Sequence, residues 1–205
     1  MPREIFEKVR AARIAALQTE LATIPLDPAE PIVLEIGCGN GHFLTAYGTV
    51  HPDELCIGVD LRLERIDKAL RKRRRANLDK VFFLRCEVRD FLCVLPAAIR
   101  LRDIYVLFPD PWPKKRHHKN RLLTAAFLDE LAVRARPGAR LVFRTDFQPY
   151  FDEVADTIVR HPRWRLQAPG APLFEHPTVF QSRAPIFHTL SAEAVPEEAK
   201  AADRR

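Results

Sequence analysis

No apolar run in this 205-residue sequence approaches the roughly 18 residues that a membrane-spanning helix requires. The first residues, MPREIFEKVR, mix charged and apolar side chains, so they lack the apolar core of a secretory signal. Only four cysteines occur, and none forms a CxxC pair or has the spacing of a metal site. We therefore expect a cytoplasmic protein with reduced cysteines, no membrane association and no bound metal.

Glycine is also scarce, yet three of the seven glycines fall within five residues, at Gly37, Gly39 and Gly41. They directly follow the apolar run IVLEI, where a tight turn lets the backbone approach a ligand at the start of the next helix. A dinucleotide-binding fingerprint would need its third glycine at position 42, which is His42 here. Glu35 places a carboxylate beside this loop, which opposes a diphosphate and favours a cationic ligand. A nicotinamide enzyme is thus the least favoured interpretation.

Charge is uneven, because basic residues exceed acidic ones and give a formal net charge of +6. Such an excess favours a polyanionic partner. Residues 4–22 predict an amphipathic helix, and a proline-rich linker completes an N-terminal segment over residues 1–30. The length is that of a single domain with a sizeable core.

From residue 31 onward, strand-like and helical runs alternate, which predicts an α/β fold with a mostly parallel sheet and helices on both faces over residues 31–190. The strand-like runs are Ile32–Ile36, Leu55–Val59, Val81–Leu84, Ile104–Phe108 and Arg140–Arg144. The helical runs are about His42–Val50, Leu63–Ala76, Val88–Leu95, Leu122–Ala135 and Tyr150–Val159. Arg163–Gln167 and Ile186–Leu190 predict two final antiparallel strands, and residues 191–205 a frayed tail.

Two acids follow the next strand-like runs. Asp60 ends the run CIGVD, where a carboxylate can accept both hydroxyls of a ribose, and Glu87 ends VFFLRCE, where it could accept from an adenine amine. Together with Glu35 and the glycine turn, they suit a ligand with ribose, adenine, an ammonium and a sulfonium, which describes S-adenosylmethionine. The alternative is a glycine-rich connector whose acids only cap helices.

The segment LFPDPWPKKRHHKNR, residues 107–121, is the most informative stretch. Its three prolines fix φ and are expected to push the residue before each of them toward extended geometry, holding Asp110 and Trp112 at a strand end. Six cationic or titratable side chains follow without interruption: Lys114, Lys115, Arg116, His117, His118 and Lys119. An acid and an indole beside a cationic patch suit a planar base attached to a polyanion. The alternative is a stiff turn followed by a solvated basic helix start.

DPWPKKRHHKNR, TDFQPY at 145–150 and PTVFQSR at 177–183 together resemble the bacterial tRNA (guanine-N7)-methyltransferase family, over about residues 30–190. The resemblance implies a Rossmann-like class I methyltransferase fold with seven strands, S-adenosylmethionine as cofactor, and methylation of guanine N7 in the tRNA variable loop. On the cofactor side it implies Glu35, Asp60, Glu87 and Asp110, with the glycine turn. On the substrate side it implies Lys114, Asp146, Thr178, Val179, Phe180 and Gln181.

The sequence departs from the family pattern at Gln181, where the family usually has Glu. Gln keeps an acceptor oxygen but loses the charge. The family usually has Glu after the second strand and Asp after the third. Here Asp60 is therefore one methylene shorter than the usual acid, and Glu87 is one methylene longer. These departures leave open a methyltransferase acting on another RNA, or a weakened tRNA-binding relative.

Guanine N7 carries an in-plane lone pair, so no proton must be removed, and a carboxylate near the base could stabilise the charge that develops. Asp110 is the first candidate for this catalytic role and Asp146 the second. Arg183 is a plausible phosphate or pocket contact, and the cluster Arg71–Arg75 is interpreted as a solvated face. The cations expected on the RNA backbone are Lys115, Arg116, Lys119 and Arg121. The sequence leaves open whether the protein is a monomer or a homodimer.

Overall fold

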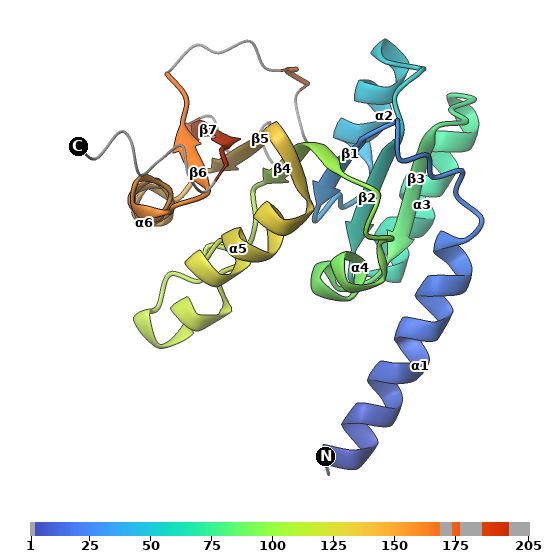
Figure 1. Ribbon diagram of the computed structural model, residues 1–205, viewed down its shortest axis with the longest axis horizontal. Helices are drawn as coiled ribbons and strands as arrows, with labels where there is room; N and C mark the ends of the chain where they lie inside the picture. Colours follow the sequence, from blue (N-terminus) through green and yellow to red (C-terminus); the bar gives the residue numbers. More distant parts are fainter. Residues whose placement is uncertain (1–2, 169–173, 177–185, 197–205) are drawn as a thin grey trace.

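A computed structural model describes residues 3–168, 174–176 and 186–196 (Figure 1). In this part of the chain a single seven-stranded sheet has the order β3-β2-β1-β4-β5-β7-β6. The first five strands are parallel, and β7 is antiparallel to both β5 and β6. The strands are β1 (Ile32–Ile36), β2 (Cys56–Asp60), β3 (Val81–Arg85), β4 (Leu101–Leu107), β5 (Ala135–Thr145), β6 (Trp164–Leu166) and β7 (His188–Ala194). The predicted α/β class and the antiparallel end of the sheet are confirmed.

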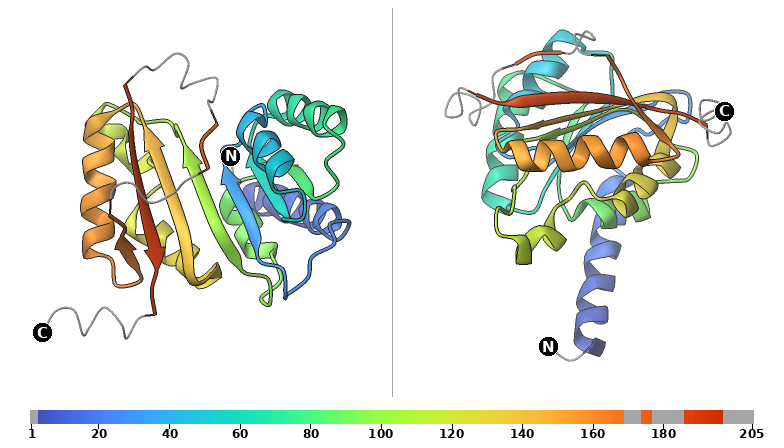
Figure 2. Two further views of the ribbon diagram at one scale, coloured as in Figure 1. Left: turned by 90° about the horizontal axis from the view of Figure 1, so that it is seen from above. Right: turned by 90° about the vertical axis from the view of Figure 1, so that its left-hand side faces the viewer.

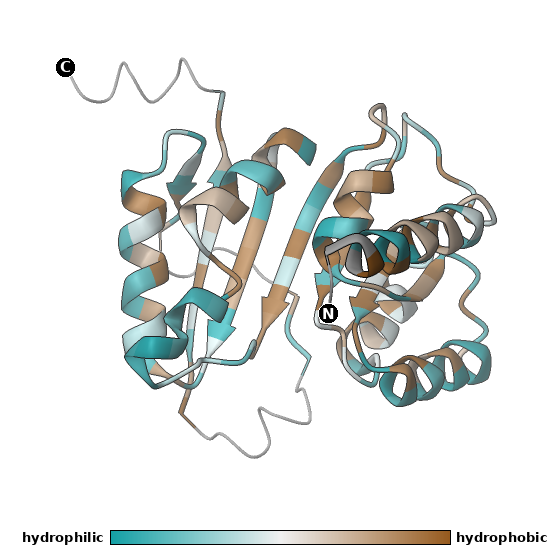
Figure 3. Ribbon diagram, turned by 90° about the horizontal axis from the view of Figure 1, so that it is seen from below, coloured by the Kyte–Doolittle hydropathy of each residue, from teal (hydrophilic) through white to brown (hydrophobic). Residues whose placement is uncertain are grey.

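Helices cover both faces of the sheet because the strand residues alternate between two apolar cores. On one face Val33, Phe83 and Tyr105 pack with α2 (His42–Val50) and α3 (Leu63–Arg75). The opposite face carries the larger core, which receives the helices α4 (Val88–Val94), α5 (Ala125–Arg134) and α6 (Gln148–Arg160). Figure 3 shows apolar bands along the strands, interrupted by polar ones, and alternating apolar and polar bands along the helices that flank the sheet.

The first helix, α1 (Arg3–Leu21), docks on the body by its C-terminal half while its first turns extend away from it (Figure 2). Leu17 and Leu21 enter the larger core. Arg10 and Arg13 lie on the same side of the helix and pair with the buried Asp90 of α4 at 3.0 and 2.6 Å. None of the helices in the described ranges is long and apolar enough to cross a membrane.

The structure corrects several predicted boundaries. The predicted tail from Ser191 is wrong as far as Val195, because β7 continues to Ala194 and Ser191, Ala192, Ala194 and Val195 are buried. Pairing with β5 and β6 on both sides explains this burial. The strand β5 begins at Ala135, before the predicted Arg140, and η1 (Lys115–Asn120) is a 3-10 helix in the basic segment.

Gly41 begins α2 with φ +70°, and a Cβ there would lie 2.6 Å from the Cβ of Ala69 and 2.8 Å from the ring of Phe83. Gly37 has a similar φ of +74°, but a Cβ on this residue would meet nothing within 4 Å. Alanine should therefore cost about 1–2 kcal/mol of backbone strain at either site. Gly41→Ala should lose about 1–3 kcal/mol more through overpacking. Urea unfolding measures both variants, and equal losses would contradict the packing argument.

Candidate active site

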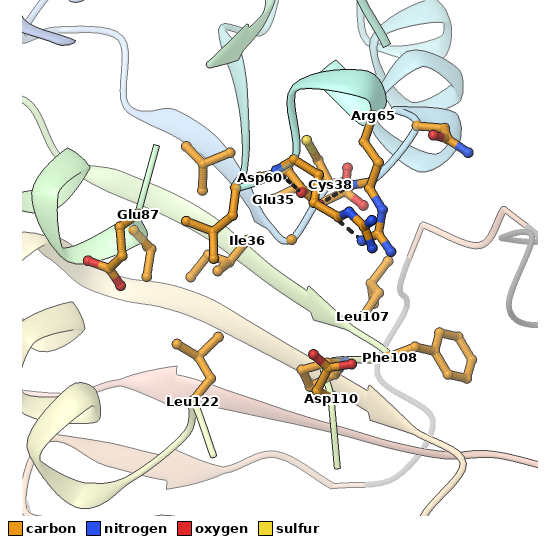
Figure 4. A pocket seen from close by; sticks show the side chains of 18 of the residues that line it. Glu35, Ile36, Cys38, Asp60, Arg65, Glu87, Leu107, Phe108, Asp110 and Leu122 are labelled. Atoms are coloured by element: carbon orange, nitrogen blue, oxygen red, sulfur yellow. Dashed lines mark hydrogen bonds and ion pairs between the residues drawn. The ribbon is translucent and has the colours of Figure 1, made fainter. Parts of the chain in front are cut away.

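A cavity of about 650 Å³ lies at the carboxyl ends of β1, β2, β3 and β4. This is the edge where open α/β sheets bind ligands. Its walls come from the connection after each strand, so the fold brings residues from distant parts of the sequence together. Four acids predicted from the sequence line it: Glu35, Asp60, Glu87 and Asp110. Figure 4 shows Glu35 close to Asp60, with Glu87 and Asp110 at other sides of the cavity.

Asp60 is 6% exposed and fixes the shape of the glycine turn. Its Oδ2 accepts a hydrogen bond from the backbone N–H of Gly39 at 3.0 Å, and its Oδ1 accepts from the N–H of Arg62 at 2.8 Å. The guanidinium of Arg65 lies 3.5 Å from Oδ2. By accepting one N–H from each turn, the Asp60 carboxylate joins the turn after β1 to the turn after β2.

Glu35 lies deeper, at 4% exposure, and its Oε2 has no hydrogen-bond partner among the described residues. Burial raises the pKa of Glu35 to about 8; a backbone hydrogen bond from Leu44 lowers it and the nearby charge of Asp60 raises it. A buried carboxyl without a full set of partners favours a ligand that brings positive charge.

Glu87 is the N-cap of α4, where its Oε2 accepts from the N–H groups of Arg89 and Asp90 at 2.8 and 3.2 Å. Glu87 therefore does cap a helix, as the alternative interpretation expects, but capping is not its only place in the structure. The same side chain lines the cavity, and both capping bonds use one of its two oxygens. The predicted contact with an adenine amine stays a prediction.

The proline-rich loop after β4 has a conformation that the sequence did not indicate. Phe108 and Trp112 each precede a proline, yet their φ angles are +52° and +46°, so the predicted extended geometry is wrong for both. Bulky residues rarely occupy this region, and the surrounding contacts must impose it. The N–H of Phe108 donates to the carbonyl of Arg144 at 2.8 Å, and the Trp112 ring packs edge-on against His117 at 5.7 Å. Asp110 is exposed between these two fixed points.

The cationic segment divides into exposed and buried residues. Lys115, Arg116 and Lys119 are exposed on η1. Arg121 is only 3% exposed, so its predicted contact with an RNA phosphate is wrong. Its Nε donates to the carbonyl of Pro111 at 2.9 Å, and its guanidinium pairs with Glu153 and lies 4.8 Å over the Tyr150 ring.

The substrate-side residues are only partly covered by the structure. Lys114 and Asp146 are exposed, and neither lines the cavity. Asp146 does not cap α6; the hydroxyl of Thr145 accepts from the N–H of Phe147 instead. The other predicted members lie outside the described residues: Thr178, Val179, Phe180, Gln181 and Arg183.

Sequence reasoning missed other lining residues, among them His42, Arg62, Arg65 and Asn120. His42 directly follows Gly41, and Arg62 lies two residues after Asp60, so proximity to the glycine turn and to this acid could have indicated both. In the basic cluster of α3, Lys72 donates to the carbonyl of Asn40 at 2.8 Å, which supports the glycine turn.

In the same cluster Arg73 donates to the carbonyl of Leu78 at 2.9 Å, so the solvated-face interpretation fits only Arg71, Arg74 and Arg75. The four cysteines are free. Within the described ranges, no group of three or more His, Cys, Asp or Glu side chains could hold a metal.

Comparison with known sequences identifies the family. Residues 29–182 match the family described as "Putative methyltransferase". A tRNA (guanine-N(7)-)-methyltransferase of Hyphomonas neptunium is 38% identical over 163 residues, which cover 79% of this chain and 74% of that protein. This chain belongs to the tRNA (guanine-N7)-methyltransferase family. A family member from Rubrobacter xylanophilus is 37% identical over 136 residues, 66% of this chain and 60% of that protein. The chain thus spans about 60% of the length of several family members that it matches.

Solved structures agree with the family on the fold. A 16S rRNA (adenine(1408)-N(1))-methyltransferase from Catenulisporales acidiphilia aligns with a TM-score of 0.54 at 20% identity, covering 83% of this chain and 92% of that one. An rRNA methylase from Streptococcus thermophilus aligns with a TM-score of 0.56 at 12% identity, covering 82% and 88%. The Rossmann-like class I methyltransferase fold expected from the family resemblance is confirmed.

The buried Glu35 predicts a pH dependence of folding stability. With its pKa raised to about 8, the folded protein without ligand holds a proton that the unfolded chain releases near 4.5. The folded state binds more protons in that window, so the free energy of unfolding should fall as pH rises from about 5 to 8. Glu35→Gln should flatten this decline. Urea unfolding of both proteins across the window checks it, and parallel curves would exclude Glu35 as the cause.

Proposed function

We propose that this protein transfers a methyl group from S-adenosylmethionine to N7 of a guanine in the variable loop of tRNA. The observation that carries the proposal is one cavity lined by Glu35, Asp60, Glu87 and Asp110, with the exposed cations of η1 beside its rim. Family membership supports the same activity, because the curated relatives are tRNA (guanine-N(7)-)-methyltransferases.

The donor set of the cavity fits this cofactor. The Oε2 of the buried Glu35 has no hydrogen-bond partner in the described part of the chain, and it marks a place where positive charge is favourable, as an ammonium group would supply. Each oxygen of Asp60 accepts one backbone N–H and keeps a second lone pair, with which the carboxylate can accept ribose hydroxyls. Glu87 can keep its capping bonds while offering its other oxygen to an amine. Among the described residues, a Cβ on Gly37 would meet nothing within 4 Å, which leaves room for a ligand against the backbone.

S-adenosylmethionine would supply a methyl group on a positively charged sulfur, which the N7 lone pair of guanine can take without loss of a proton. The protein therefore has to orient the base and compensate the positive charge that the base acquires. Asp110 is exposed at the cavity, and its carboxylate can accept hydrogen bonds from the base and stabilise that charge. Trp112 lines the same cavity and can pack against a planar base.

Methyl transfer from labelled S-adenosylmethionine to tRNA, followed by digestion to nucleosides, tests the activity directly. The expected product is 7-methylguanosine. A tRNA with 7-deazaguanine at the acceptor position is the matched control, because carbon at position 7 has no in-plane lone pair. A labelled product other than 7-methylguanosine, or no product from any tRNA, would contradict the proposed function.

Asp110→Asn should separate catalysis from binding, because Asn keeps the size and an acceptor but loses the charge. Methyl transfer should slow by about 10²-fold or more in single-turnover reactions with saturating tRNA and cofactor. The affinity for tRNA should change far less. A rate within a few-fold of the parent would exclude Asp110 from the charge-stabilising role, and Asp146→Asn would then be the next variant to measure.

The exposed cations of η1 should contribute to the salt dependence of tRNA binding. Neutralising Lys115, Arg116 or Lys119 to Gln should reduce the slope of log K against log salt by roughly 0.7–0.9 for each phosphate interaction removed. Arg74→Gln is the control and should leave the slope unchanged, because Arg74 lies on the solvated face of α3 and not on η1. Binding titrations at several salt concentrations measure the slopes. If all four variants had the slope of the parent, the η1 cations would not contact phosphates, and η1 would be a solvated surface.

A further inference from the structure

Arg144 is a buried cation near the carboxyl end of β5. Strand pairing places it beside Leu107 of β4 and Thr189 of β7. Its side chain is only 4% exposed. A guanidinium buried this deeply is tolerated only where partners compensate for the lost water. Its partners therefore indicate what it does in the fold.

These partners come from two separate stretches of chain. The guanidinium pairs with Oε1 of Glu175 at 2.6 Å, and its Nε donates to the hydroxyl of Thr189 at 2.8 Å. It also lies 4.8 Å over the ring of Phe187. Glu175 precedes residues 177–185, whereas Phe187 and Thr189 follow them. A single side chain thus joins the two flanks of that segment.

Both flanks also contact residues that line the cavity. Phe187 packs edge-on against Phe108 with ring centres 6.0 Å apart. On the other flank, Phe174 packs against Phe43 of α2 at 5.5 Å. Phe43 and Phe108 both line the cavity. The flanks are therefore connected to two sides of the cavity by aromatic contacts and to each other by Arg144.

We propose that Arg144 is a positioning residue: it holds residues 174–176 and 186–189 against Phe43 and Phe108 of the cavity wall, and thereby orients the tRNA substrate toward Asp110, two residues after Phe108. The proposal rests on the proposed function, because the oriented substrate is tRNA. An arginine suits this role because its planar fork can meet a carboxylate and a hydroxyl while its face lies on an aromatic ring. Lysine offers charge without that fork.

Arg140 provides a matched control. It lies four residues earlier on β5, pairs with Asp103 at 3.0 Å and does not line the cavity. Arg144→Met and Arg140→Met therefore remove the same charge from the same strand. Hydrogen–deuterium exchange of residues 174–176 and 186–189 measures the flanks, tRNA methylation measures substrate orientation, and calorimetry measures cofactor affinity.

Arg144→Met should speed exchange in both flanks by about 10-fold or more relative to Arg140→Met. It should lower kcat/KM for tRNA by about 10–100-fold through substrate misplacement. Cofactor affinity should stay within about twofold of the parent. Arg144→Lys should restore only part of the loss. Equal flank exchange in the two Met variants, or equal losses of kcat/KM, would overturn the proposal.

Glu175→Gln covers the case in which Arg144→Met does not fold, because the Glu175 side chain is 55% exposed and Gln keeps an acceptor oxygen for the guanidinium of Arg144. Faster exchange of residues 174–176 in Glu175→Gln supports the proposal, and unchanged exchange overturns it. If the parent protein methylated no tRNA, that result would reject the proposed function but would not test the role of Arg144 in holding the flanks. The exchange comparison would still decide whether Arg144 holds the flanks.

Discussion

The carboxylate of Asp60 connects the two turns on which the cavity depends. It ends β2, and it accepts backbone N–H groups both from the glycine turn after β1 and from the start of its own turn. Three closely spaced turn glycines at positive φ would otherwise have many conformations available. By fixing Gly39, Asp60 sets the direction in which α2 leaves the sheet. Close packing of Gly41 against Ala69 and Phe83 then locks that direction.

Around this fixed turn the protein keeps groups that are unfavourable in isolation. Glu35 is buried without a full set of partners, and its pKa is raised to about 8. Phe108 and Trp112, which line the same cavity, are held at positive φ. A buried carboxyl and strained backbone angles gathered around one cavity are typical of functional sites, where the surrounding fold supplies the compensating stability. The two apolar cores that cover the faces of the sheet are the part of this fold that can supply such stability.

The parts of the structure that the sequence predicted depend on local pattern. Alternating apolar runs predicted the parallel sheet, and the acids at strand ends predicted the lining of the cavity, because carboxyl ends of parallel strands meet at one edge. Arg121 and Arg144 could not be assigned from pattern. Arg121 ends a basic segment and Arg144 ends an apolar run, so a cation at either place could equally face solvent. Tertiary contacts with Glu153 and Glu175 make both of them interior residues. The positive φ of Phe108 likewise depends on a bond to β5.

Arg121 changes the explanation of why the loop that carries Asp110 is stiff. Prolines restrict φ within the loop, but they do not fix its position on the body. Arg121 supplies that fixation, since its Nε holds the carbonyl of Pro111, next to Asp110, while its guanidinium pairs with Glu153 of α6. In the sequence, the exposed cations of η1 lie between Pro111 and Arg121, the two residues joined by this hydrogen bond. One buried arginine therefore sets the place of both the candidate catalytic carboxylate and the cationic surface, so a polyanion bound to η1 would lie in a fixed relation to Asp110.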